Sequence, residues 1–146
     1  MNTTSFEGGG STEDGNGFRN GPSGVPSVLV IEQTEATRRL MEQALRPDYR
    51  VDAVATYEQA RSHAAETRYD GIILSVYQRD VEMGIELMED LRASPHSDDV
   101  PIIFVGRSPL DRDTSSLLDA GFDDVLRMPF AESELLDIMA RHVPTE

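Results

Sequence analysis

The chain has 146 residues, enough for one domain with a buried core, and its 27 acidic and 13 basic residues give a net charge of −14. It has no cysteine, which excludes disulfides, thiol catalysis and thiolate metal sites. Neither a long apolar run nor a secretory signal is present. We therefore expect a soluble cytoplasmic protein that binds neither nucleic acid nor membranes, since both attract basic surfaces.

All the basic residues are arginines, and lysine is absent. Excess acid without lysine favours a salt-tolerant source, because salt screens the repulsion between like charges. A genome that prefers arginine codons explains the missing lysine equally well. Both interpretations stay open.

Residues 1–26 differ in composition from the rest of the chain. They hold seven of the eleven glycines, interspersed with serine, threonine and asparagine. Such a segment has too little apolar surface to offset the entropy lost on ordering. We predict a disordered tail at 1–26 and a folded domain at 27–143.

The folded part alternates short apolar runs with helical periods, five times over. The apolar runs predict strands at 27–31, 50–55, 72–76, 101–105 and 124–128. The helical periods predict helices at 34–45, 56–66, 84–93, 109–120 and 132–142, the first, second and fourth with their N-caps at Thr34, Thr56 and Ser108. Thr34 and Thr56 are expected N-caps, Gln59 completes a capping box with Thr56, and Ser108 with Pro109 is expected to begin the fourth helix.

This alternation favours right-handed crossovers and a parallel sheet covered on both faces. The predicted fold class is α/β, a doubly wound five-stranded parallel sheet with five helices. Ligands of such sheets gather at the carboxyl ends of the strands. The third run, Ile-Ile-Leu-Ser-Val, places Ser75 at the end of a buried strand, so Ser75 becomes the first candidate for a functional residue.

The order of blocks from Val28 to His142 resembles the receiver domain of bacterial response regulators, the CheY-like, flavodoxin-like fold. The resemblance rests on Val-Leu-Val-Ile at 28–31, Tyr-Asp-Gly-Ile-Ile-Leu at 69–74, Gly-Ile-Glu-Leu-Met at 84–88, Pro-Ile-Ile at 101–103, Ala-Gly-Phe-Asp-Asp at 120–124 and Pro-Phe at 129–130. Each motif is weak alone, but their order is specific. The resemblance also implies a cis peptide at Met128-Pro129.

The resemblance implies a phosphorylation site in which an aspartate accepts a phosphoryl group beside Mg²⁺. A pair of acids on the first strand, a hydroxyl on the fourth and a lysine on the fifth complete that site. In this sequence the matching positions carry the wrong residues. They are Ser75 for the aspartate, Glu32 and Gln33 for the acid pair, Gly106 for the hydroxyl and Met128 for the lysine.

One remaining carboxylate is a poor site for Mg²⁺, which requires octahedral oxygen ligands, so we expect no cofactor and no bound magnesium. A serine hydroxyl also needs an adjacent base before it attacks phosphorus. No catalytic residue is therefore predicted, and the chain is not expected to be an enzyme. Ser75 is interpreted as the mark of a lost phosphorylation site.

The first hypothesis for function is a degenerate receiver domain in two-component phosphorelay signalling. It would bind a signalling protein of unknown identity without being phosphorylated. The alternative is a regulatory domain that binds a small ligand in the vacated pocket.

Three further features belong to this hypothesis. Val125 stands at the position of the family's aromatic switch residue, and Arg107 is hypothesised to be a gate over the site through an acidic partner. The fourth helix, fifth strand and fifth helix form the hypothesised interaction and homodimer face. The charged residues on this face are Arg112, Asp119, Asp123, Asp124, Arg127 and Arg141.

Overall fold

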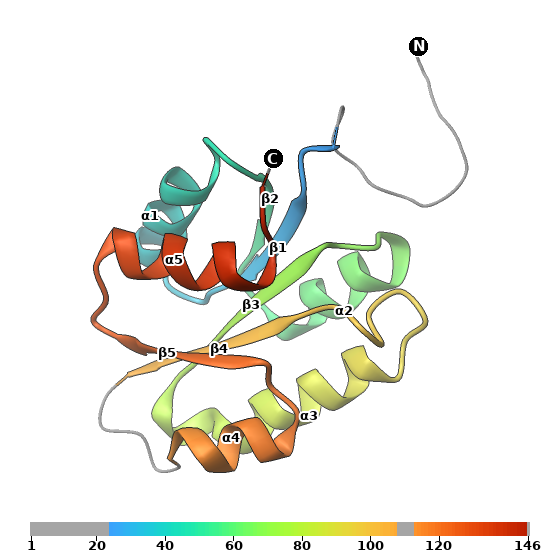
Figure 1. Cartoon of the computed structure of the whole chain (residues 1–146). Helices are drawn as coiled ribbons and strands as arrows, with labels where there is room; N and C mark the ends of the chain where they lie inside the picture. Colours follow the sequence, from blue (N-terminus) through green and yellow to red (C-terminus); the bar gives the residue numbers. More distant parts are fainter. Residues whose placement is uncertain (1–23, 108–112, 146) are drawn as a thin grey trace.

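Five parallel strands form the centre of the molecule, in the order β2-β1-β3-β4-β5 (Figure 1). A computed structural model describes residues 24–107 and 113–145. The strands are β1 (Ser27–Ile31), β2 (Arg50–Val54), β3 (Gly71–Val76), β4 (Ile102–Arg107) and β5 (Asp124–Met128). The predicted fold class is confirmed. The tail predicted at 1–26 lies almost entirely outside the described residues.

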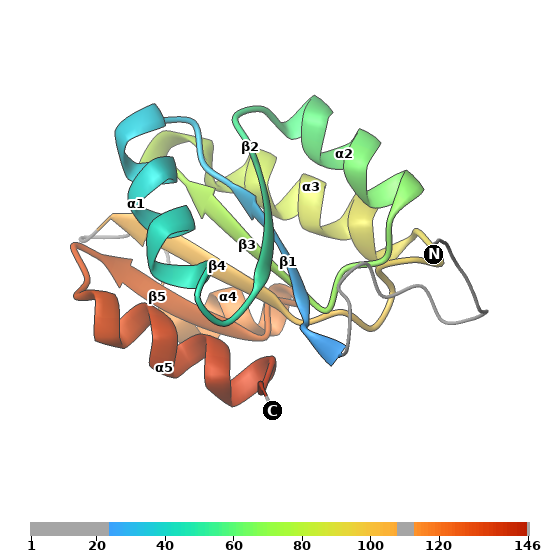
Figure 2. The same cartoon turned by 90° about the horizontal axis from the view of Figure 1, so that it is seen from above.

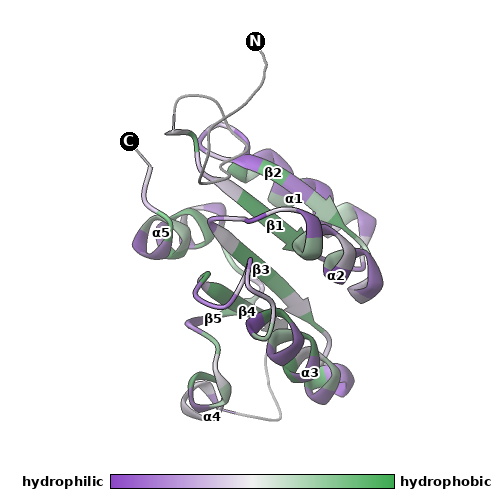
Figure 3. Cartoon of the chain, turned by 90° about the vertical axis from the view of Figure 1, so that its right-hand side faces the viewer, coloured by the Kyte–Doolittle hydropathy of each residue, from purple (hydrophilic) through white to green (hydrophobic). Residues whose placement is uncertain are grey.

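Two layers of helices cover the sheet. Helices α1 (Glu35–Leu45) and α5 (Glu132–His142) lie on one face, and α2 (Tyr57–Glu66), α3 (Val81–Arg92) and α4 (Thr114–Ala120) lie on the other (Figure 2). A short 3-10 turn, η2 (Gln78–Asp80), joins β3 to α3. The apolar strands fill the interior and polar residues gather on the outer helix surfaces (Figure 3). No helix in the described ranges is long and apolar enough to cross a bilayer.

The central strands are buried because helices cover both faces. β1 and β3 are buried at every position, which is what their uninterrupted apolar runs predict. Gly84 lets α3 approach β3 closely, since a Cβ at this position would lie 2.7 Å from Val76 Cγ2. Thr56 and Gln59 form the predicted capping box of α2. The Met128-Pro129 peptide is cis, as the resemblance implies.

Two helix starts differ from the prediction. Helix α3 begins at Val81, three residues before the predicted start. Helix α4 begins at Thr114, where the Asp113 carboxylate accepts a hydrogen bond from the Ser116 amide at 2.8 Å. Because Asp113 is extended, no helix continues through it from the predicted start. The predicted Ser108 cap itself lies outside the described residues.

Candidate functional site

The candidate site lies where β1, β3, β4 and β5 end. The parallel register pairs Ile31 with Leu74, which places the next two residues, Glu32 and Ser75, side by side. Further along this edge, Gly106 of β4 pairs with Val76 of β3.

Met128 reaches the same edge on β5, where it pairs with Arg107 of β4. The sequence-predicted positions therefore do meet at one edge of the sheet. The chemistry that these residues can support depends on the hydrogen bonds and the burial of each side chain.

Glu32 is the only carboxylate of the predicted acid pair, and its side chain is enclosed at 1% exposure. Its Oε2 accepts a hydrogen bond from the Thr34 amide at 2.8 Å. Its Oε1 has no partner among the described residues. Arg38 donates to the Glu32 carbonyl oxygen at 3.0 Å, so this arginine holds the backbone of the loop. The carboxylate thus serves to shape the start of α1.

Ser75 is equally enclosed, at 2% exposure, and its Oγ has no hydrogen-bond partner within the described part of the chain. The three histidines lie elsewhere. His63 Nδ1 is 3.4 Å from Tyr69 Oη, beside the beginning of β3. His142 Nε2 is 2.8 Å from Asp124, the first residue of β5, and His96 precedes β4. No imidazole stands at the Ser75 edge to act as a base.

A hydrogen bond between two hydroxyls crosses the mouth of the site. Thr34, at the N-cap position of α1, contacts the Tyr77 hydroxyl just beyond β3. Thr34 makes no capping bond of its own to the helix. Sequence reasoning missed this bridge, because nothing in the sequence links residues 34 and 77. We call it the Thr34–Tyr77 bridge.

Gln33, at the second position of the acid pair, faces the other side of the loop. It lines a groove of about 430 Å³ together with Tyr57 and Asp80. Burial raises the pKa of Tyr57 to about 12, and the negative charge of Asp80 adds to this rise. Tyr57 thus remains a neutral phenol at physiological pH.

Met128 and Arg107 line a different groove, between α1 and α5. This α1–α5 groove has a volume of about 350 Å³, and its apolar walls are Leu40, Met41, Ala44, Met128, Pro129, Phe130 and Leu135. Arg107 is exposed and has no ion pair within the described ranges. Within the described ranges Arg107 thus has no acidic partner of the kind that the gate hypothesis requires, and its side chain lines the groove.

Val125, at the family's switch position, is half buried and packs against the core beneath α3 and α4. An aliphatic side chain there has no hydroxyl to bond a neighbouring element. The packed position is compatible with a fixed surface.

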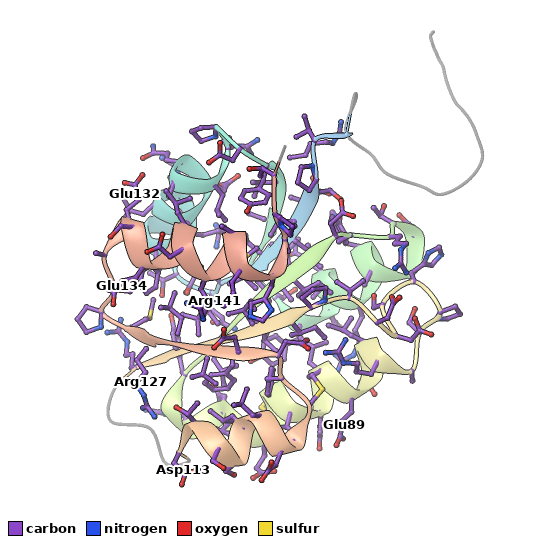
Figure 4. The ribbon with its side chains drawn as sticks, viewed as in Figure 1. Glu89, Asp113, Arg127, Glu132, Glu134 and Arg141 are labelled. Atoms are coloured by element: carbon purple, nitrogen blue, oxygen red, sulfur yellow. The ribbon has the colours of Figure 1, made fainter. Side chains whose placement is uncertain are left out.

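Most charges predicted for the interaction face have partners inside the chain. Asp123 binds Arg92 at 2.6 Å and accepts the Ile102 amide at 2.8 Å, which ties β4 to the loop before β5. Asp124 binds Arg141 at 2.9 Å, and Arg141 extends from α5 toward β5 (Figure 4).

The remaining members of that set are less constrained. Arg127 donates to the Thr114 hydroxyl at 3.1 Å, which joins β5 to α4. Asp119 is exposed on α4. Arg112 lies outside the described residues.

Several known proteins are similar to this chain in sequence or in fold. The chain is 36% identical over 112 residues to the KDP operon transcriptional regulatory protein KdpE of Escherichia coli (strain K12), covering 76% of this chain and 48% of KdpE. It is 33% identical over 113 residues to the transcriptional regulatory protein PrrA of Mycobacterium leprae (strain TN), covering 76% of this chain and 47% of PrrA. The chain spans about half the length of these relatives.

Solved structures of receiver domains resemble the fold of this chain. The receiver domain of sensor histidine kinase PA1611 from Pseudomonas aeruginosa PAO1, described with a magnesium ion in its active site cleft, matches at 30% identity with a TM-score of 0.69. That match covers 82% of this chain and 98% of the PA1611 domain. The chemotaxis response regulator CheY4 of Vibrio cholerae has the same fold, with a TM-score of 0.73 at 22% identity over 82% of this chain and 99% of CheY4.

The response regulator receiver domain family matches residues 28–140, and the chain belongs to this family. It is a receiver domain of two-component signal transduction. The residues at its strand ends differ from those that the resemblance implies for a phosphorylation site.

The residues at this edge do not fit the magnesium ion that such receivers use. Within the described ranges, no group of three or more carboxylate or imidazole side chains is placed to hold a metal. Glu32 Oε2 is already bonded to the Thr34 amide, and Ser75 and Gln33 supply neutral oxygens. A hard divalent cation prefers several carboxylates or phosphate oxygens.

Proposed function

We propose that this receiver domain acts in phosphorelay signalling as a protein-interaction module whose state does not depend on phosphorylation. The observation that carries the proposal is the Ser75 hydroxyl, which is enclosed at 2% exposure with no imidazole at its edge of the sheet. Phosphoryl transfer requires positioned charge to stabilise the transferred group. Here Met128 and Gly106 supply neither an ammonium nor a hydroxyl.

The Thr34–Tyr77 bridge supports the same proposal. It joins the loop after β1 to the segment after β3, the two segments that follow Glu32 and Ser75. With Glu32 also bonded to the α1 backbone, the site rests in one arrangement. A receiver in one arrangement presents one surface to its partners.

We also propose a cytoplasmic location and no catalytic activity for the domain, which its membership of the receiver family supports. The face formed by α4, β5 and α5 is the proposed contact surface for a signalling protein. Asp119 and Leu118 are exposed on this face, and Leu118 is 42% exposed. The paired charges around them give this face a fixed shape.

The test is incubation with a small phosphoryl donor such as acetyl phosphate, with and without Mg²⁺, followed by intact-mass measurement. We expect no phosphoryl adduct, whereas a receiver that retains its aspartate, treated in parallel, becomes modified. A stable adduct on Ser75 would overturn the proposal. A thermal shift that depends on Mg²⁺ would also contradict it.

A second candidate function is binding of a small polar ligand at the vacated site. The enclosed oxygens Glu32 Oε1 and Ser75 Oγ favour it, because both lack a partner among the described residues. An unbonded buried polar atom costs about 1–3 kcal/mol, which a ligand with hydrogen-bond donors would offset. Native mass spectrometry of the protein from its own cells would reveal a retained ligand, and an unliganded mass would argue against this function.

A further inference from the structure

A groove lies between helices α2 and α3, on the face of the sheet opposite to α1 and α5 (Figure 2). This α2–α3 groove has a volume of about 430 Å³. Its lining includes Gln33 of the loop after β1, Tyr57 and Arg61 of α2, and Asp80, Met83 and Glu86 where α3 begins. Ligand pockets in proteins typically measure about 300–1,000 Å³ and combine apolar walls with a few polar groups. The α2–α3 groove has the size and the composition of such a pocket.

The α3 side of this groove carries two acids with an apolar residue between them. Asp80, Met83 and Glu86 are spaced three residues apart, so each is a neighbour of the next on the helix surface. The helical rise separates Asp80 from Glu86 by about 9 Å along the axis. Met83 is 55% exposed, although it is a large apolar residue. The groove thus presents a carboxylate, apolar surface and a second carboxylate in succession.

Little positive charge offsets these acids. Glu58 of α2 adds a third carboxylate to the lining. Arg61 is the basic residue among the described residues that line the groove, and it pairs with Asp90 at 3.0 Å. None of the three lining acids forms a salt bridge with another described residue. A concave surface with this excess of negative charge attracts cations.

Two enclosed oxygens at the groove also lack hydrogen-bond partners. They are Gln33 Oε1 and Tyr57 Oη, and neither has a partner in the described part of the chain. Burial first, and then the charge of Asp80, raises the pKa of Tyr57, which places the Asp80 carboxylate near this phenol. Leaving a buried polar atom without a hydrogen bond is costly. Acidity alone attracts any cation, whereas these oxygens favour a cation that donates hydrogen bonds.

We propose that the α2–α3 groove binds a linear aliphatic diamine or polyamine. One ammonium group lies among Asp80, Gln33 and Tyr57, because an ammonium has three N–H donors and these side chains supply three acceptors. The methylene chain covers Met83, and the second ammonium pairs with Glu86. Gln33 and Tyr57 are half buried, so a small rotation of each turns its oxygen toward the ligand.

This proposal goes beyond the interaction-module function and does not rest on it. Amine binding requires no phosphoryl acceptor and involves neither Ser75 nor Met128. A ligand that joins Gln33 to α3 fixes the loop after β1, so the groove offers the domain an input other than phosphorylation. Failure of amine binding would leave the acetyl phosphate result unchanged, and an adduct on Ser75 would leave the groove unaffected.

Isothermal titration calorimetry of the full chain with putrescine, a diamine with a four-carbon chain, tests the proposal. At low salt we expect one site per chain with a Kd below about 1 mM. Butylamine has the same carbon chain but a single ammonium group. It should bind at least about tenfold more weakly, because it leaves one carboxylate of the groove without a partner.

Substitutions locate the site. Asp80→Asn and Glu86→Gln should each weaken putrescine binding at least about tenfold, since each removes one carboxylate and keeps the shape of the side chain. Asparagine is also a good N-cap, so Asp80→Asn preserves the beginning of α3. The matched control is Glu89→Gln, which removes the same charge from the same helix (Figure 4). Glu89 is not among the described residues that line the groove, so this variant should keep its affinity within about twofold.

The net charge of −14 makes these controls decisive, because an acidic chain attracts every cation to some degree. The proposal is overturned if butylamine binds as tightly as putrescine. It is also overturned if Glu89→Gln weakens binding as much as Glu86→Gln, since general attraction then explains the affinity. An absence of binding heat up to about 10 mM putrescine would overturn it as well.

Discussion

Replacing Ser75 with alanine should stabilise the protein, contrary to the usual effect of a change in a buried core. The Ser75 hydroxyl is enclosed and has no partner among the described residues. Most substitutions at such positions destabilise by 0.5–3 kcal/mol, as a general rule. The exception arises because this side chain holds an unbonded polar atom.

The magnitude follows from two opposing contributions. An unbonded buried hydroxyl costs about 1–3 kcal/mol, which alanine removes. Deleting one oxygen leaves a void of roughly 20 Å³, which costs about 0.5 kcal/mol at about 24 cal/mol per Å³. The difference predicts a stabilisation of about 0.5–2.5 kcal/mol. For a domain of this size that corresponds to a melting temperature higher by about 2–12 °C.

Urea unfolding followed by circular dichroism measures this change, and two serines provide matched controls. Ser97 is also enclosed without a partner for its Oγ, so Ser97→Ala should stabilise by a similar amount. Ser27 is enclosed but its Oγ lies 3.4 Å from Asp70 Oδ2, so Ser27→Ala should be neutral or destabilising. If Ser75→Ala destabilises while Ser97→Ala stabilises, Ser75 has a bound partner and the reasoning about a lost site fails.

Four further perturbations test other parts of the structure. Gly84→Ala places a Cβ 2.7 Å from Val76 Cγ2 and should destabilise the protein by about 1–3 kcal/mol in urea unfolding. Adding Val76→Ala should restore part of this stability, whereas an unchanged unfolding midpoint in Gly84→Ala would refute the close approach. Burial alone would raise the pKa of Asp124, but hydrogen bonds from His142 and the Val125 amide, with the charges of His142 and Arg141, hold this pKa below 3.8. Stability should therefore fall as the pH drops below 3.8, because Asp124 then becomes protonated. Asp124→Asn should lose this acid-dependent share of the stability, as acid unfolding curves will show. Because the pKa of Tyr57 is raised from 10.0 to about 12, stability should decline as pH rises across that interval and decline less in Tyr57→Phe; equal alkaline unfolding curves would contradict the assignment. Added salt should raise the melting temperature of a chain with a net charge of −14, and indifference to salt would exclude the salt-tolerant interpretation.

The strands could be predicted from the sequence because positions buried on both faces are apolar. β1, β3 and β4 lie under helices on both faces, so nearly every position is apolar and the run is easily recognised. Helix starts are harder to predict. Ser108 with Pro109 is a typical beginning of a helix, yet Asp113 with the Ser116 amide is an equally good cap and begins α4.

The sequence predicted where the site lies in the sheet, but not which side chains there contact one another. Register alone brings Glu32 next to Ser75, so the resemblance located the right edge of the sheet. The Thr34–Tyr77 bridge joins side chains 43 residues apart, and only the folded chain reveals such a pair. The charged face shows the same limit, since Asp123 and Asp124 are exposed-looking acids in sequence that bind Arg92, His142 and Arg141 in the structure.

Met128 shows how this edge of the sheet differs from the phosphorylation site that the resemblance implies. It occupies the position for which the resemblance implies a lysine, and its half-buried side chain forms a wall of the α1–α5 groove. A lysine at this position would restore a positive charge beside the site but no phosphoryl acceptor. Met128→Lys should therefore leave acetyl phosphate unable to modify the protein, because Ser75 still offers no carboxylate.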